Sequence, residues 1–171
     1  MRDRVPARGR APAWLPRVAR LSLLFLLLLL QACGGAPKLP DTTPDTTLAA
    51  KLVASDDLNS GGGQKARPVV VRLYELRTAG AFSSADFYSL YEREAETLGS
   101  DLLGREEISL APGQRHPVDK VISPETAYLG VLVAFRDIDR AAWRTTTRLK
   151  SDATNNVIVK IAADNVAAAA Y

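Results

Sequence analysis

A segment that is apolar on both sides most constrains the fold of this chain. In Val69–Leu76, with the sequence VVVRLYEL, one side of an extended strand carries Val69, Val71 and Leu73, and the other carries Val70, Tyr74 and Leu76. A strand that is apolar on both faces must be covered on both faces. The segment therefore predicts a central strand in a layered domain.

The residues after this strand predict an amphipathic helix. Ser83 is a candidate N-cap with Asp86 three residues later, and Phe82 and Phe87 have the spacing of a hydrophobic staple. Apolar residues then recur at helical spacing up to Leu98, and the next residue is a glycine that can end the helix. We expect this helix to cover one face of the strand, a packing role with no function of its own.

The rest of the chain predicts short strands separated by turns. Alternating or apolar segments lie at Leu48–Ala54, Glu106–Leu110, Pro117–Ile122, Tyr128–Phe135, Trp143–Leu149 and Asn156–Ile161. A helix is an alternative for the alanine-containing first segment, and the pattern gives no assignment for the tail VAAAAY. The predicted fold class is mainly β: an antiparallel β-sandwich of immunoglobulin-like architecture, with a short helical insertion between early strands.

The first 32 residues have the pattern of an export signal. Six arginines precede the leucine-rich segment Leu21–Leu30. Ten residues are too few to cross about 30 Å of hydrocarbon, which takes about 20 residues in a helix, but they suit the apolar region of a secretory signal. We therefore predict a signal peptide at residues 1–32.

The residues that follow resemble the bacterial lipobox, Leu30-Gln31-Ala32-Cys33-Gly34. The resemblance implies that Cys33 is acylated and becomes the mature N-terminus, and Gly34 resembles the sorting residue of outer-membrane lipoproteins. Residues 33–47 are rich in Gly, Pro, Asp and Thr, and predict a flexible tether. The predicted sandwich domain then occupies residues 48–171. No cofactor is expected beyond the covalent lipid on Cys33.

Charge argues against a nucleic-acid partner. The whole chain has 22 basic and 19 acidic residues. Without the leader, 16 basic and 18 acidic residues remain, so the basic character belongs to the signal peptide. A mature domain with a slight negative charge lacks the basic footprint of a nucleic-acid-binding protein.

Motifs for catalysis or metal binding are missing from the sequence. His116 is the only histidine and Cys33 the only cysteine, which makes a zinc site improbable. The carboxylate pairs Asp56-Asp57, Glu106-Glu107 and Asp137/Asp139 could in principle do acid–base chemistry. Adjacent strand residues point to opposite faces, however, so Glu106 and Glu107 cannot converge. We predict no enzyme and no small-molecule substrate.

A set of ordered motifs is similar to the TssJ family, outer-membrane lipoproteins of the type VI secretion system. The motifs are PVVVRLYEL at 68–76, ADFYSLY at 85–91, LGSDLL at 98–103, LAPG at 110–113, YLGVLVAFRD at 128–137 and WR at 143–144. The resemblance implies a transthyretin-like sandwich in the periplasm, tethered to the outer membrane. It also implies a partner, the C-terminal periplasmic region of the inner-membrane protein TssM.

The resemblance places the partner contact in the loop between the first two strands. The loop residues are Ser55, Asp56, Asp57, Leu58, Asn59, Ser60, Gly61, Gly62, Gly63, Gln64, Lys65 and Arg67. We expect Leu58 and Asn59 to anchor the contact, and Asp56, Asp57 and Lys65 to steer it. A tethered carbohydrate- or peptide-binding sandwich and an exported hydrolase are the alternatives.

Overall fold

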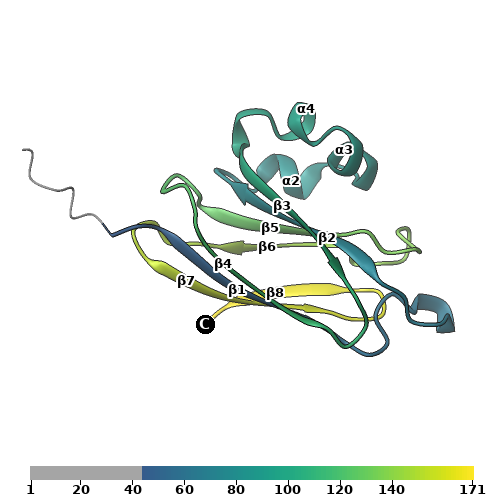
Figure 1. Cartoon of the computed structure of the whole chain (residues 1–171). Helices are drawn as coiled ribbons and strands as arrows, with labels where there is room; N and C mark the ends of the chain where they lie inside the picture. The colour runs from purple at the N-terminus through teal and green to yellow at the C-terminus, as the bar shows by residue number, and fades with distance from the viewer. Residues whose placement is uncertain (1–43) are drawn as a thin grey trace, which may run out of the picture. The chain divides into compact units, whose positions relative to one another are not determined.

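Eight strands form two four-stranded sheets in the computed structural model, which describes residues 44–171 (Figure 1). In the first sheet the order is β4 (Arg115–Val121), β1 (Thr47–Ala54), β7 (Thr154–Ile161) and β8 (Val166–Ala170). In the second sheet it is β3 (Leu102–Leu110), β2 (Val69–Leu76), β5 (Tyr128–Val133) and β6 (Arg144–Arg148). The predicted mainly-β sandwich is confirmed.

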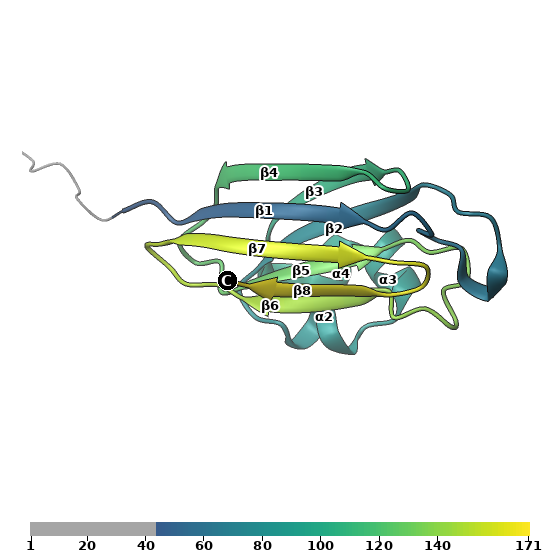
Figure 2. The same ribbon diagram turned by 90° about the horizontal axis from the view of Figure 1, so that it is seen from below.

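One strand pair departs from the antiparallel prediction. β1 and β7 run parallel, from Thr47 opposite Thr154 to Ala54 opposite Ile161, whereas the other strand pairs within the two sheets are antiparallel. Strands paired in parallel need a long connection, and here the chain passes through the second sheet between β1 and β7. Figure 2 shows β1 and β7 side by side in the middle of the first sheet.

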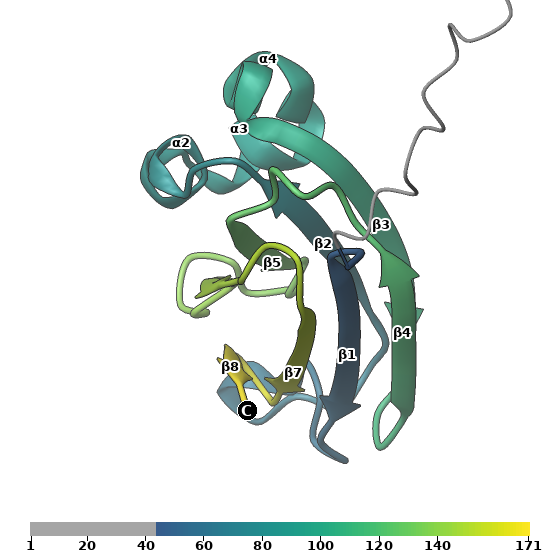
Figure 3. The same ribbon diagram turned by 90° about the vertical axis from the view of Figure 1, so that its left-hand side faces the viewer.

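The main core lies between the two sheets. Alternate side chains from both sheets are fully buried there, among them Leu52, Val71, Val131 and Val159, each with 0% exposure. Each inward row follows the period of two that strands impose. β3 and β4 belong to different sheets, and the turn at residues 111–114 connects them along one side of the sandwich (Figure 3).

A second core covers the opposite face of β2. Tyr74, Leu76, Phe82, Leu90, Leu98 and Leu132 form this cluster, and they come from β2, β5 and the helical segment. The central strand is therefore buried on both faces, as its sequence predicts.

The predicted single helix is wrong, because the segment forms three short helices. They are α2 (Gly80–Ser84), α3 (Phe87–Glu92) and α4 (Glu94–Leu98). Ser83 lies inside α2, and the N-cap is Asp86, whose carboxylate accepts a hydrogen bond from the Ser89 amide at 2.9 Å. Extended backbone at Ala85 separates α2 from α3, and a non-helical Arg93 separates α3 from α4.

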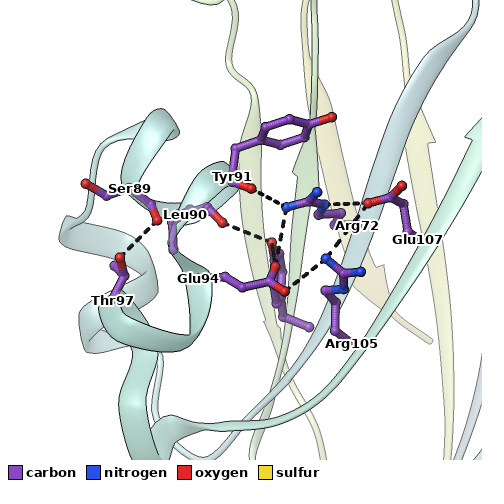
Figure 4. Close-up of polar contacts among 9 residues, drawn as sticks. Arg72, Ser89, Leu90, Tyr91, Glu94, Thr97, Arg105 and Glu107 are labelled. Atoms are coloured by element: carbon purple, nitrogen blue, oxygen red, sulfur yellow. Dashed lines mark hydrogen bonds and ion pairs between the residues drawn. The ribbon is translucent and has the colours of Figure 1, made fainter.

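Hydrogen bonds fix the helical layer on β2 (Figure 4). Arg72 donates to the Tyr91 carbonyl at 2.6 Å and to the Glu107 carboxylate at 2.7 Å. Glu94 accepts from the Tyr74 hydroxyl at 2.9 Å and pairs with Arg105 at the same distance. Burial, partly offset by the hydrogen bond from Arg72, raises the pKa of Tyr74 to about 12.

Several strand limits differ from the prediction. β3 starts at Leu102 rather than Glu106, β4 starts at Arg115 rather than Pro117, and β5 ends at Val133 rather than Phe135. His116 lies within β4, opposite Leu52. β8 was not predicted, because alanine is depleted in strands and only pairing with β7 holds it extended. Thr46, assigned to the tether, is buried and bonded to the Asp152 amide.

The predicted signal peptide, Cys33 and most of the tether lie outside the described residues, so these assignments stay predictions. Among residues 44–171, no helix has the length and apolar character that crossing a membrane requires.

Candidate functional site

The loop at residues 55–67 lies at one end of the sandwich, where β1 ends and β2 begins (Figure 1). The β7–β8 turn at residues 162–165 and the β3–β4 turn lie beside it. Asn59 and Gly61 donate backbone hydrogen bonds to Ala162 and Ala163, both at 3.3 Å, and Gly113 donates to the Ser55 carbonyl at 3.1 Å. Segments far apart in sequence therefore support the loop.

The first half of the loop is tied to the domain rather than free. The Leu58 amide bonds to the Ser55 carbonyl, and the Arg67 amide returns to the Leu58 carbonyl at 3.0 Å. The Asn59 side chain accepts from the Arg136 amide at 2.8 Å and donates to the Pro68 carbonyl at 3.4 Å. These bonds pin the base of the loop on both sides.

Leu58 and Asn59 are buried in this structure, which argues against direct contact with a partner, and the binding role of the loop stays a prediction. Leu58 is 0% exposed and belongs to the core between the sheets, and Asn59 is 8% exposed. Asn59 also has a left-handed backbone, with φ of 58°, which asparagine tolerates better than most residues. Leu58 is an apolar side chain in a polar loop, and it is buried in the core of its own domain. This burial fixes the base of the loop.

The other loop residues divide into half-buried and exposed positions. Ser55, Ser60 and Gly61 are half-buried, whereas Asp56, Asp57, Gly62, Gly63, Gln64, Lys65 and Arg67 are exposed. The three glycines form one turn of 3-10 helix, in which Gly62 and Gly63 have φ of 73° and 78°. Glycine adopts this conformation at no steric cost, so the turn can project into solvent. We call the seven exposed residues the loop tip.

Sequence reasoning did not find the neighbours of the loop tip. Asn59, Gly61, Phe135, Arg136, Asp137, Ala163 and Asp164 line a small pocket of about 10 Å³, room for about one water molecule. The pocket joins the loop to the β5–β6 connection and the β7–β8 turn. No local signal in the sequence links these three segments, because only the sheet pairing brings them together.

The carboxylates of Glu106 and Glu107 point to opposite faces of their sheet. Glu107 pairs with Arg72 on the helical side of its sheet, whereas Glu106 pairs with Lys120 at 3.2 Å between the sheets. The prediction that these two carboxylates diverge is confirmed. Across residues 44–171, no group of three or more His, Cys, Asp or Glu side chains is placed to hold a metal ion.

Lys120 and Glu75 form an ion pair at the opposite end of the sandwich from the loop. Their side chains lie 2.8 Å apart, and a Cβ atom added at Gly104 would meet the Glu75 carboxylate at 2.8 Å. Burial lowers the pKa of Lys120, but the bonds and charges of Glu75 and Glu106 outweigh it and raise that pKa. This cluster links the two sheets, because Glu75 belongs to β2 and Lys120 to β4.

Solved structures resemble this domain over nearly their whole length. The T6SS lipoprotein TssJ1 from Pseudomonas aeruginosa is 32% identical, with a TM-score of 0.71, over 75% of this chain and 98% of that one. The Serratia marcescens Lip, a membrane-bound component of the type VI secretion system, is 22% identical, with a TM-score of 0.67, over 74% and 96%.

A third similar chain comes from a structure described as the T6SS protein TssM C-terminal domain (869–1107) from EAEC. It is 23% identical, with a TM-score of 0.59, over 72% of this chain and 97% of that one. At such identities, the second and third likenesses concern the fold alone. No curated protein matches the sequence.

A family model matches residues 46–164, which include both sheets except β8, together with the loop at residues 55–67. That model is T6SS-SciN, described as type VI secretion lipoprotein, VasD, EvfM, TssJ. The match confirms the resemblance of the ordered motifs. This chain belongs to the TssJ family of type VI secretion lipoproteins.

Proposed function

We propose that this chain is a periplasmic lipoprotein anchored in the outer membrane, and that it binds the C-terminal periplasmic region of TssM. In this role it anchors the membrane complex of a type VI secretion system. The observation that carries the proposal is the family match over residues 46–164, joined to the lipobox at Cys33. The chain acts by binding, with no catalytic step.

The first residue of β1 and the loop tip are separated by the length of the first sheet. β1 starts at Thr47, just after the predicted tether, and ends at Ala54, just before the loop. Eight residues of strand span about 25 Å at about 3.3 Å per residue. The loop tip therefore lies at the opposite end of the sandwich from Thr47, which leaves it accessible to a partner protein when the chain is held through its N-terminal side.

The loop tip can bind a partner at a small cost in conformational entropy. Its base is fixed by Leu58 in the core and by the bonds of Asn59, so binding orders few residues. The exposed charges have both signs: Asp56 and Asp57 on one side of the turn, and Lys65 and Arg67 on the other. Such charges steer association and fix orientation more than they add affinity.

A charge-reversal pair tests the loop tip. In Lys65→Glu with Arg67→Glu, both side chains are exposed, so the domain should fold with an unchanged melting temperature. Capture of the purified TssM C-terminal domain should fall at least tenfold. Lys160→Glu, an exposed lysine in β7, is the matched control and should leave capture unchanged. Full capture by the loop variant would mean that TssM binds elsewhere.

The anchor is tested separately. Cys33→Ser removes the thiol that carries the acyl chains, and the protein should then leave the outer-membrane fraction and accumulate in the soluble periplasm. Globomycin, which blocks processing of acylated precursors, should shift the mobility of the unaltered protein on a gel. Continued processing under the inhibitor would contradict acylation at Cys33.

A further inference from the structure

A shallow hollow lies on the outer face of the first sheet, and Figure 2 shows this face in front with the helices behind it. The residues that line it are Ala49, Ala50, Lys51, Pro117, Asp119, Asn156 and Tyr171. Its volume is about 210 Å³, against about 10 Å³ for the pocket beside Asn59, so it has room for a ligand rather than a single water molecule. Ala49 is near the start of β1 and the loop follows the end of β1, so the hollow is separate from the loop tip.

Strand pairing explains the shape of the hollow. Ala49 of β1 lies opposite Asp119 of β4 and Asn156 of β7. The Tyr171 amide donates to the Asn156 carbonyl at 3.0 Å, so these four residues form one row across the sheet. Neighbouring strands lie about 4.8 Å apart, and the small methyl group of Ala49 leaves a low floor between the longer side chains on either side.

Polar side chains of both charges border the hollow. Lys51 brings an ammonium donor, Asp119 a carboxylate acceptor, and Asn156 an amide that can do both. The ion pairs within residues 44–171 use neither Lys51 nor Asp119. Their two charges cancel, so the hollow favours a neutral ligand with hydroxyl and carbonyl groups over an anion or a cation.

Tyr171 adds an aromatic ring at the side of the hollow. Its side chain is 74% exposed, more than any other large apolar side chain of the described domain. An exposed aromatic face beside hydrogen-bonding groups matches a sugar ring, which has apolar C–H faces and a rim of hydroxyl groups. Tyr171 lies beyond residues 46–164, so this ring is a feature of the chain outside the family match.

An apolar hollow lies next to the polar one, over β7 and β8. It has a volume of about 230 Å³ and is lined by Ile158, Lys160, Ala167, Ala168 and Ala169. Ala169 lies opposite Ile158 and two residues before Tyr171. A ligand that stacks on Tyr171 can therefore reach a polar hollow and an apolar hollow together.

We propose that the outer face of the first sheet binds a glycan that carries N-acetyl groups. One sugar ring stacks on Tyr171 and enters the polar hollow. There Asp119 accepts hydrogen bonds from its hydroxyl groups, and Lys51 and Asn156 donate to its oxygens. An acetamido methyl group contacts the apolar hollow. This binding site goes beyond the proposed function and shares no residue with the loop tip.

Calorimetric titration with chitotetraose, an oligomer of N-acetylglucosamine, tests the site in the full chain, purified in a detergent without a sugar headgroup. Chitotetraose should bind, and cellotetraose, which has the same rings without acetamido groups, should bind at least tenfold more weakly. Tyr171→Ala and Asp119→Ala should each weaken binding at least fivefold with an unchanged melting temperature, because both side chains are exposed. Tyr88→Ala and Asp139→Ala, which alter an exposed tyrosine and an exposed aspartate outside the hollow, are the matched controls and should bind normally.

Ala49→Leu tests the hollow itself. The larger side chain fills the floor without removing a polar group, so binding should be lost while the domain stays folded. No measurable binding of chitotetraose, or equal binding by Tyr171→Ala and Tyr88→Ala, would overturn the proposal. Equal binding of cellotetraose would overturn the assignment of the acetamido group to the apolar hollow.

Sedimentation with purified peptidoglycan sacculi distinguishes the source of the glycan. Co-sedimentation that Tyr171→Ala loses identifies a cell-wall glycan, whereas binding of chitotetraose without co-sedimentation identifies a soluble oligosaccharide. TssM capture is measured separately and should be unchanged in Tyr171→Ala. A failure of the glycan site can therefore be told apart from a failure of the proposed function.

Discussion

The guanidinium of Arg72 lies over the ring of Tyr91, with its central carbon 4.0 Å from the ring centroid. Arg72 comes from the central strand β2, and Tyr91 comes from α3. The same guanidinium bonds to the Tyr91 carbonyl and to Glu107, and lies 3.4 Å from the Glu94 carboxylate (Figure 4). One side chain thus fixes a helix of one layer to two strands of another.

Arg72→Ala should destabilise the domain by about 3 kcal/mol, because it removes the cation that Glu94 and Glu107 share and leaves the Tyr91 carbonyl without its donor. Glu94 then keeps only Arg105 as its ion-pair partner. Arg72→Lys should recover only part of this, since an ammonium cannot reproduce the planar fork. Urea unfolding measures both changes. Arg140→Ala is the matched control: its side chain is 80% exposed, 3.8 Å from Asp137, and the loss should be below about 0.5 kcal/mol.

Tyr74 should make the domain sensitive to alkali. Its pKa is raised from 10.0 in the unfolded chain to about 12 in the fold. Between these values the unfolded chain loses its phenol proton and the native state keeps it, so the free energy of unfolding falls as pH rises. Tyr74→Phe should flatten this decline in urea unfolding between pH 10 and pH 12. An unchanged slope would mean that other groups cause it.

Gly130→Ala should overpack the core under the helices. A Cβ atom there would lie 2.8 Å from a Leu76 methyl group and 3.2 Å from the Phe82 ring. Overpacking typically costs about 1–3 kcal/mol, measurable as a lower urea midpoint. Gly80→Ala is the control, because the nearest atom to its added methyl is 4.0 Å away. Equal losses in both variants would argue against the steric cause.

Leu58→Ala should lower the stability of the domain more than it lowers the capture of TssM. The side chain is 0% exposed within the main core, and truncating a buried leucine costs about 2–5 kcal/mol. At a temperature where the variant remains folded, the capture of TssM should fall far less than for the loop-tip charge reversal. Loss of capture without loss of stability would restore Leu58 as a direct contact.

Prediction from sequence worked best where burial alternates. The two-sided pattern of Val69–Leu76 predicted a central strand, and the structure buries Tyr74 and Val71 on opposite faces. It worked less well for the helical segment, because Asp86 serves as a cap within it and interrupts a pattern that looks continuous. Periodicity reports which face is buried and says little about where the backbone turns.

The loop shows the same division. Its glycines and polar residues predicted a projecting connection. The burial of Leu58 could not be predicted in the same way, because it depends on the space between the two sheets, which no local sequence pattern describes. β8 was missed for a related reason, since an alanine segment becomes a strand only through its partner β7.

The sequence by itself determined the two-sided central strand, the projecting loop and the family, because these follow from local patterns and ordered motifs. Only the tertiary structure decided the parallel pairing of β1 with β7, the burial of Leu58 and the pairing of β8 with β7. Those features depend on which distant segments meet, and that choice is made by packing over the whole domain rather than by any one stretch of chain.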